Sequence, residues 1–160
     1  MVSSEALRDD VTVPTWNEFA ISAPELAARV GGLFTAYRHH TMASLRMDGS
    51  PRVSGTEVEF ADGDLQLGMM PGTRRADDLR RDPHIAIHSH NVEPPEDDSI
   101  WTGEAKLSGR AIQLVGTGDE VDRFRIEIEE VVLTGWGTPA DHLVIELWRA
   151  GDGLTRFERR

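Results

Sequence analysis

The stretch that decides the fold is residues 41–88, TMASLRMDGSPRVSGTEVEFADGDLQLGMMPGTRRADDLRRDPHIAIH. Asp48-Gly49 and Asp62-Gly63 divide its first part, and Asp-Gly between apolar runs is a strong signal for a hairpin turn. Apolar and polar residues alternate in the three runs beside these turns, at 41–46, 52–60 and 65–69. This pattern predicts an antiparallel meander of three strands.

A short charged segment follows the meander. Residues 74–81, RRADDLRR, place two acids before the last two arginines, and a helix favours acids near its N-terminus and bases near its C-terminus. Asp82-Pro83 closes this segment, because the residue before a proline disfavours helical backbone angles. We therefore predict a helix over 74–81 and a further strand over 84–90.

The N-terminal region predicts helix over residues 15–37. Ser22-Ala-Pro-Glu25 matches the capping-box pattern, with the proline in the first turn. Gly31-Gly32 weakens the middle of this helix, so a break is expected there. The apolar residues of one helical face recur at the expected spacing: Leu26, Val30, Leu33, Phe34 and Tyr37.

The C-terminal half predicts more strands. Residues 91–99 hold two prolines and four acids and predict a mobile loop, and Gly151-Asp-Gly153 turns the chain into a short tail. Strands are predicted at 101–114, 124–133 and 142–149. The total of six or seven strands with Gly-rich turns predicts a mainly β barrel with flanking helices. We expect one domain over 1–160, with a helical segment at about 15–38 and the barrel from about 39.

Composition narrows the classes of function. The chain has 160 residues, a formal net charge of −11 and no Cys, which argues against a thiolate metal site and against non-specific nucleic-acid binding. No apolar run is long enough to span a membrane, and the N-terminus has no basic region followed by an apolar one. We therefore expect a cytoplasmic protein that acts on a small molecule rather than on nucleic acid or a membrane.

Arg74 and Arg75 break the charge rule of the predicted helix, because they add positive charge to its positive end. Each misplaced charge costs on the order of 0.3–1 kcal/mol, and a bound anion would reverse the sign. Gly72 lets the backbone approach a ligand, and Thr73 offers a hydroxyl and a cap. The pattern favours a phosphate-bearing ligand at this turn. The alternative is a solvated basic turn paired with the nearby acids.

Other chemistry has little support in the sequence. His88 and His90 alternate with an apolar face without an acidic partner at fixed spacing, so no metal site is expected. No serine lies in a nucleophile elbow, and no common nucleotide-binding glycine motif occurs. The catalytic residues stay unknown at this point.

Three runs resemble the pyridoxamine 5′-phosphate oxidase-like proteins, the flavin-binding split β-barrels: MASLRMDGSPRVSGTEVEF, DGDLQLGMMPGTRRADDLRRDPHIAIH and GEAKLSGRA. The resemblance covers residues 36–114 well and the ending HLVIELWRAGDGLTRFERR moderately. It implies a six-stranded antiparallel Greek-key split barrel that forms a homodimer, with FMN at the dimer interface. It also implies that backbone at Arg52, Val53 and Ser54 lines the flavin ring and that Gly68 and Met69 cover it.

The same resemblance assigns the phosphate grip to Thr73, Arg74 and Arg75, and places Trp148 against the cofactor. Thr56-Glu57 stands where the oxidase proper has a phosphate-contacting Lys, which argues against vitamin B6 phosphate as the substrate. We therefore expect an FMN-dependent oxidoreductase with an unknown substrate. The alternatives are a reductase that uses a deazaflavin coenzyme, and a non-catalytic flavin- or haem-binding carrier or sensor. A deazaflavin tail needs a longer basic groove, for which only Arg46, Arg80 and Arg81 are available.

Overall fold

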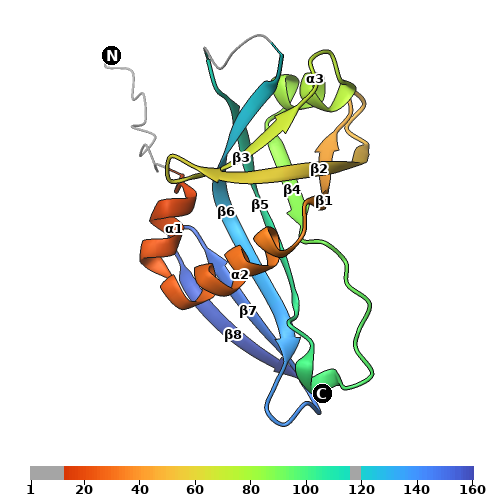
Figure 1. Cartoon of the computed structure of the whole chain (residues 1–160). Coiled ribbons are helices and arrows are strands. Elements are labelled where there is room, and N and C mark those ends of the chain that lie inside the picture. The colour runs from red at the N-terminus through yellow and green to blue at the C-terminus, as the bar shows by residue number, and fades with distance from the viewer. Residues whose placement is uncertain (1–12, 116–119) are drawn as a thin grey trace, which may run out of the picture.

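The computed structural model describes residues 13–115 and 120–160 of the chain (Figure 1). Three α-helices, one short 3₁₀ helix and eight strands follow one another in this part of the chain. Their order is α1 (Trp16–Ser22), α2 (Pro24–Ala36), β1 (His39–Leu45), β2 (Pro51–Ala61), β3 (Asp64–Met69), α3 (Arg74–Arg81), β4 (His84–His88), η1 (Asp98–Ile100), β5 (Glu104–Gln113), β6 (Asp122–Trp136), β7 (Leu143–Arg149) and β8 (Gly153–Arg159).

Six of the strands close into an antiparallel barrel. The order across the sheet is β3-β2-β1-β4-β5-β6-β7-β8, and β3 also pairs with β6. The order β3-β2-β1-β4 is that of a Greek key. The long strand β6 closes the barrel, because it pairs with β5 and its start also pairs with β3, while its end pairs with β7. The predicted six-stranded Greek-key barrel is thereby confirmed, with β7 and β8 extending the sheet beyond it.

The meander and its turns follow the sequence prediction. Asp62 and Gly63 both have positive φ, at 54° and 79°, as a tight primed hairpin turn requires. The helix predicted at 74–81 is α3, with Thr73 in extended conformation before it. These turns and this helix could be predicted because each depends only on residues that are neighbours in the sequence.

The two N-terminal helices cover one side of the sheet (Figure 1). Their buried faces include Phe19, Val30 and Phe34, each at most 2% exposed. Trp148 reaches this layer from β7, where its ring centroid lies 4.8 Å from that of Phe19. The N-terminal segment therefore completes a core whose other members come from α3 and the barrel strands, together with Trp148 of β7.

Three local predictions were wrong. The helix breaks at Ala23 rather than at Gly31-Gly32, because Pro24 has no N–H and restricts the residue before it. The capping box lies at Thr15 and Glu18 rather than at Ser22, whose hydroxyl accepts a hydrogen bond from Trp148. The tail after residue 153 is a strand, β8, which pairs with β7 along its whole length.

Among the described residues, no helix is both long and apolar enough to cross a membrane.

Candidate functional site

The start of α3 is built as the charge pattern predicted. The Thr73 hydroxyl accepts a hydrogen bond from the N–H of Ala76 at 3.4 Å, so Thr73 caps the helix. Gly72 has a φ of 73°, which turns the chain sharply into the cap. Arg74 and Arg75 are then the first two helical residues, where backbone N–H groups have no partner inside the helix.

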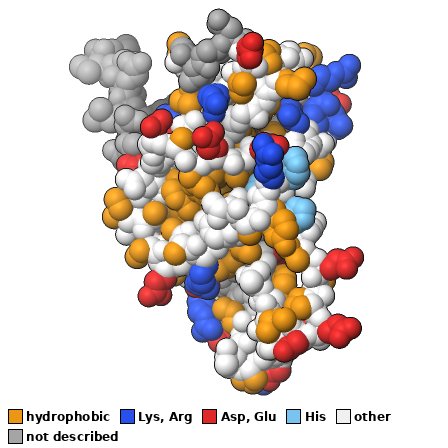
Figure 2. Space-filling view, in the orientation of Figure 1, with side chains coloured by type: hydrophobic (Ala, Val, Ile, Leu, Met, Phe, Trp, Pro, Cys, Tyr) orange, Lys and Arg blue, Asp and Glu red, His pale blue; other side chains and the backbone are white. Residues whose placement is uncertain are grey.

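A cavity of about 380 Å³ lies at this helix start. Five of the residues that line it are candidate cofactor residues from the sequence, and Met70 completes the wall. We call this cavity the cradle, lined by Arg52, Ser54, Met70, Thr73, Arg74 and Arg75. Figure 2 shows Lys and Arg side chains gathered at the end of the molecule that carries α3.

Asp78 organises the arginines beside the cradle. Its carboxylate is buried and accepts hydrogen bonds from Arg52 Nε at 2.6 Å, Arg81 Nη2 at 3.0 Å and the Ser44 hydroxyl at 3.1 Å. Burial alone would raise the pKa of Asp78, but the hydrogen bonds from Arg52, Arg81 and Ser44 outweigh it and hold that pKa below its ordinary value. Arg52 is thus fixed by its Nε, which leaves the rest of its guanidinium beside the cradle.

Arg80 is held in a similar way. Its guanidinium contacts Asp122 at 2.6 Å and Asp77 at 3.1 Å. The hydrogen bond to Asp122 is the main cause that raises the pKa of Arg80. Both acids of α3 are therefore occupied by Arg52, Arg80 and Arg81.

Arg74 and Arg75 have no acidic partner among the described residues. Arg75 Nη1 donates to the carbonyl of Gly55 at 2.7 Å, while its Nε is buried and has no hydrogen-bond partner there. Arg74 is exposed and forms no ion pair within the same residues. Asp77 and Asp78 pair with other arginines, so these two acids do not neutralise Arg74 and Arg75.

Two further cavities adjoin the cradle. One, of about 410 Å³, shares Arg52 and Arg74 with it and adds Arg46 and Arg81. The other, of about 320 Å³, contains Met70 together with the predicted residues Gly68 and Met69. Of the two methionines in this cavity, Met69 is 3% exposed and Met70 is 73% exposed. Met70 therefore offers more side-chain surface to a ligand than Met69.

Two predicted site residues lie apart from the others. Val53 is 71% exposed and, as its strand alternates, points to the sheet face opposite Arg52 and Ser54. Trp148 is 3% exposed, packs on Phe19 and donates its indole N–H to Ser22 at 3.0 Å. The structure does not bring Trp148 to the cradle, because the last third of the chain uses this indole to anchor α1.

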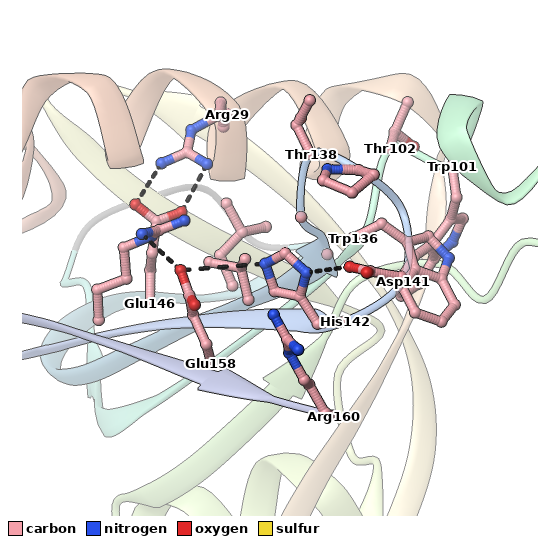
Figure 3. Close-up of a pocket in the computed structure, with 16 residues that line it drawn as sticks. Arg29, Trp101, Thr102, Trp136, Thr138, Asp141, His142, Glu146, Glu158 and Arg160 are labelled. Carbon is pink, nitrogen blue, oxygen red and sulfur yellow. Dashed lines mark hydrogen bonds and ion pairs between the residues drawn. The ribbon is translucent and has the colours of Figure 1, made fainter.

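A larger cavity, about 670 Å³, lies at the other end of the molecule (Figure 3). Arg29 of α2 contacts Glu146 with both terminal nitrogens at 2.6 Å, and this hydrogen bond raises the pKa of Arg29. His142 Nδ1 lies 2.6 Å from Asp141 Oδ1. Trp101 and Trp136 also line the cavity.

Sequence reasoning missed this cavity. Its walls come from α2, the segment before β5, the end of β6, the connection between β6 and β7, β7 itself, and the C-terminal part from β8 on. No contiguous motif joins these segments, and the only local signal is the adjacent pair Asp141-His142. Within the described parts of the chain, no group of three His, Asp or Glu side chains has a metal-binding arrangement.

Comparisons with known proteins identify the fold. No protein-family model and no curated protein sequence matches the chain. A pyridoxamine 5′-phosphate oxidase-related, FMN-binding protein from Nostoc punctiforme has a similar structure, with a TM-score of 0.59 and 9% identity over 94% of this chain and 99% of that one. PhzG from Burkholderia lata, solved with tetrahydrophenazine-1-carboxylic acid, gives 0.59 and 10% identity over 99% and 100%. A haem-binding protein from Mycobacterium smegmatis gives 0.55 and 13% over 82% and 87%.

The chain therefore has the pyridoxamine 5′-phosphate oxidase-like barrel fold, as the resemblance implied. Proteins of this fold differ in what they bind, so the fold leaves the ligand open.

Proposed function

We propose that this protein binds FMN in the cradle and is a flavin-dependent oxidoreductase. One observation carries the proposal: among the residues that the structure describes, Arg75 has a buried Nε without a hydrogen-bond partner and Arg74 beside it has no acid, at the first turn of a helix. A buried donor without an acceptor is costly, and a phosphate oxygen would satisfy it. The residues present thus fit the phosphate of FMN.

The roles of the residues follow from their positions. Arg74 and Arg75 would hold the phosphate by charge-assisted hydrogen bonds, and the N–H groups at the start of α3 would add to them. Arg52, held by Asp78, and Ser54 would face the cofactor from β2. When bound, FMN supplies the hydride chemistry, and the protein supplies orientation and electrostatics.

We also propose that the chain forms a homodimer through the outer face of its barrel. Val53, Ala43, Ala86 and Ser108 are register partners across β2, β1, β4 and β5, so they share one face. Val53 and Ala86 are exposed, and all four side chains are small. A hollow of about 280 Å³ lined in part by Ala43, Ala86 and Ser108 lies on this face, and small side chains there allow close approach by a second copy. Light scattering at micromolar concentration that shows only monomer would contradict this part.

The test of the cofactor is a titration with FMN and with riboflavin, which lacks the phosphate. We expect Arg74→Ala with Arg75→Ala to weaken FMN binding at least about 100-fold and to leave riboflavin binding nearly unchanged, since two charge-assisted contacts are lost. The control is Arg38→Ala with Arg149→Ala. It removes the same charge from two exposed residues, one just before β1 and one at the end of β7. Full FMN affinity in the double variant would remove the assignment.

A second candidate cofactor is a deazaflavin coenzyme. The 410 Å³ cavity that adjoins the cradle adds Arg46 and Arg81, which could contact a longer anionic tail, although Asp48, Asp77 and Asp78 also line it. A non-catalytic carrier of flavin or haem is the remaining alternative, since a haem-binding protein has this fold. The absorption spectrum of the purified protein separates flavin from haem, and reduction of the bound cofactor by NAD(P)H or by reduced deazaflavin separates an enzyme from a carrier.

A further inference from the structure

The 670 Å³ cavity at the far end shares no lining residue with the cradle or its two neighbours. Its volume lies within the range of small-molecule sites. Figure 3 shows Arg29, Glu146, Glu158 and His142 pointing toward one another across it, with Trp101 and Trp136 behind Asp141. The question is which chemical group these side chains would accept.

His142 is the most constrained polar side chain of this cavity. It is 10% exposed, and its ring lies directly over the backbone of Gly137, where a Cβ would be only 2.1 Å from Nε2. Nδ1 must carry a proton in order to donate to the carboxylate of Asp141, because an ionised carboxylate can only accept. In the neutral imidazole, Nε2 is then a hydrogen-bond acceptor.

This acceptor has no hydrogen-bond partner among the described residues. Glu158 Oε1 lies 4.0 Å from Nε2, too far for a hydrogen bond, and it already accepts one from Arg156 Nη1 at 3.1 Å. A carboxylate oxygen can accept more than one hydrogen bond, so a donor placed between Nε2 and Oε1 would contact both. An ammonium nitrogen has several N–H groups and a charge that complements Glu158.

The lining holds the guanidinium groups of Arg29, Arg156 and Arg160 and the carboxylates of Asp141, Glu146 and Glu158, so the preference for a donor rests on His142 Nε2. Arg29 is occupied by Glu146, and Arg156 donates to Glu158 at 3.1 Å. Trp101 and Trp136 provide aromatic faces, which attract cations and pack against apolar groups. Arg160 is the remaining guanidinium of the lining, and it is exposed.

We propose that this cavity is a second ligand site, for a small organic amine whose ammonium group bridges His142 Nε2 and Glu158 and whose apolar or aromatic body packs against Trp101 and Trp136. It is independent of the FMN site, because none of its residues line the cradle.

Isothermal titration of the full-length protein with three probes of equal shape tests the proposal. The probes are 2-phenylethylamine, 3-phenylpropionate and 2-phenylethanol, which carry a cation, an anion and a neutral group. We expect the amine to bind at least about tenfold more tightly than either of the others, which is the usual size of one charge-assisted hydrogen bond. Equal or tighter binding of the anion would overturn the proposal in favour of a site at Arg160. Binding of none would show that solvent fills the cavity and would overturn it as well.

Glu158→Gln assigns the binding to this cavity, since the amide keeps the shape and removes the charge. We expect this variant to bind the amine about tenfold more weakly, as one charge-assisted contact is lost. Glu130→Gln is the matched control, because Glu130 also pairs with an arginine, Arg149, but lies outside the cavity. Unchanged amine binding in Glu158→Gln, or the same loss in both variants, would place the amine elsewhere and overturn the proposal.

Discussion

The two ends of the molecule arrange their charges in opposite ways. At the α3 end, the acids are occupied by Arg52, Arg80 and Arg81, and Arg74 and Arg75 have no acidic partner among the described residues. At the far end, Arg29 and Arg156 are occupied by carboxylates, and in the same part of the chain the acceptor Nε2 of His142 has no hydrogen-bond partner. The kind of ligand that each end accepts therefore depends on which groups remain unpaired.

Asp78→Asn is expected to cause the largest loss of stability at either end of the molecule. The buried carboxylate holds Arg52 and Arg81, and its loss leaves two guanidinium groups without their charge partner. Because both are partly exposed, we expect a loss of about 2–3 kcal/mol in the free energy of unfolding, measured in urea, which is below the value for a fully buried pair.

Glu146→Gln provides the comparison at the other end. Its partner Arg29 is half exposed, so this variant should lose less than about 1 kcal/mol. Equal losses in the two variants would show that Asp78 contributes no more than Glu146, whose side chain is 14% exposed.

The pH dependence of the Asp78 contribution has a defined sign. Its pKa is lower in the folded protein than in the unfolded chain, so the folded state binds fewer protons there. The stabilisation is therefore fully present above the ordinary aspartate pKa of about 3.9 and is lost as pH falls through the lower, folded value. The difference in unfolding free energy between the protein and Asp78→Asn should be constant near neutral pH and shrink in acid. A difference that grew in acid would contradict this.

Two glycine substitutions sharpen the contrast with smaller effects. Gly72→Ala puts a side chain on a residue that has positive φ but free space around it, so it should cost about 1–2 kcal/mol of stability through the backbone alone.

Gly137→Ala places a Cβ against His142, so it should displace the imidazole and weaken amine binding while the melting temperature changes little. Circular dichroism melts and the amine titration measure the two effects. Full amine affinity in Gly137→Ala would show that the position of His142 is irrelevant.

The smallest expected effect is the coupling between the two ends. The variants at Arg74 and Arg75 should leave amine binding unchanged, and Glu158→Gln should leave FMN binding unchanged. Combined in one chain, their effects should add within about 0.3–0.5 kcal/mol, as for distant sites. A larger coupling, measured by titration of each ligand, would mean that the two cavities communicate.

The sequence predicted most of the barrel because the signals were local. Asp62-Gly63 sets its own turn, and Thr73 caps its own helix. One of the failures has a distant partner as its cause. Ser22 is not the helix cap because its hydroxyl accepts from Trp148, and Trp148 is not at the cradle for the same reason.

The two candidate sites differ in the same respect: one is built mainly from consecutive residues and the other from distant ones. The cradle could be predicted because Thr73, Arg74 and Arg75 are consecutive, although the sequence did not show that Asp78 would hold Arg52. The far cavity could not be predicted, because Arg29, Trp101, His142 and Glu158 meet only through tertiary packing.

The contact between Ser22 and Trp148 also bears on how the chain is made. The two residues are 126 positions apart, and Phe19, fully buried in the finished protein, packs against the same indole. During synthesis, α1 emerges long before β7, so its apolar side has no Trp148 to cover it until almost the whole chain has been translated. Contacts between such distant segments form slowly, and an exposed apolar surface invites association. A nascent chain stalled before residue 148 should therefore be a stronger client for chaperones than the full-length protein.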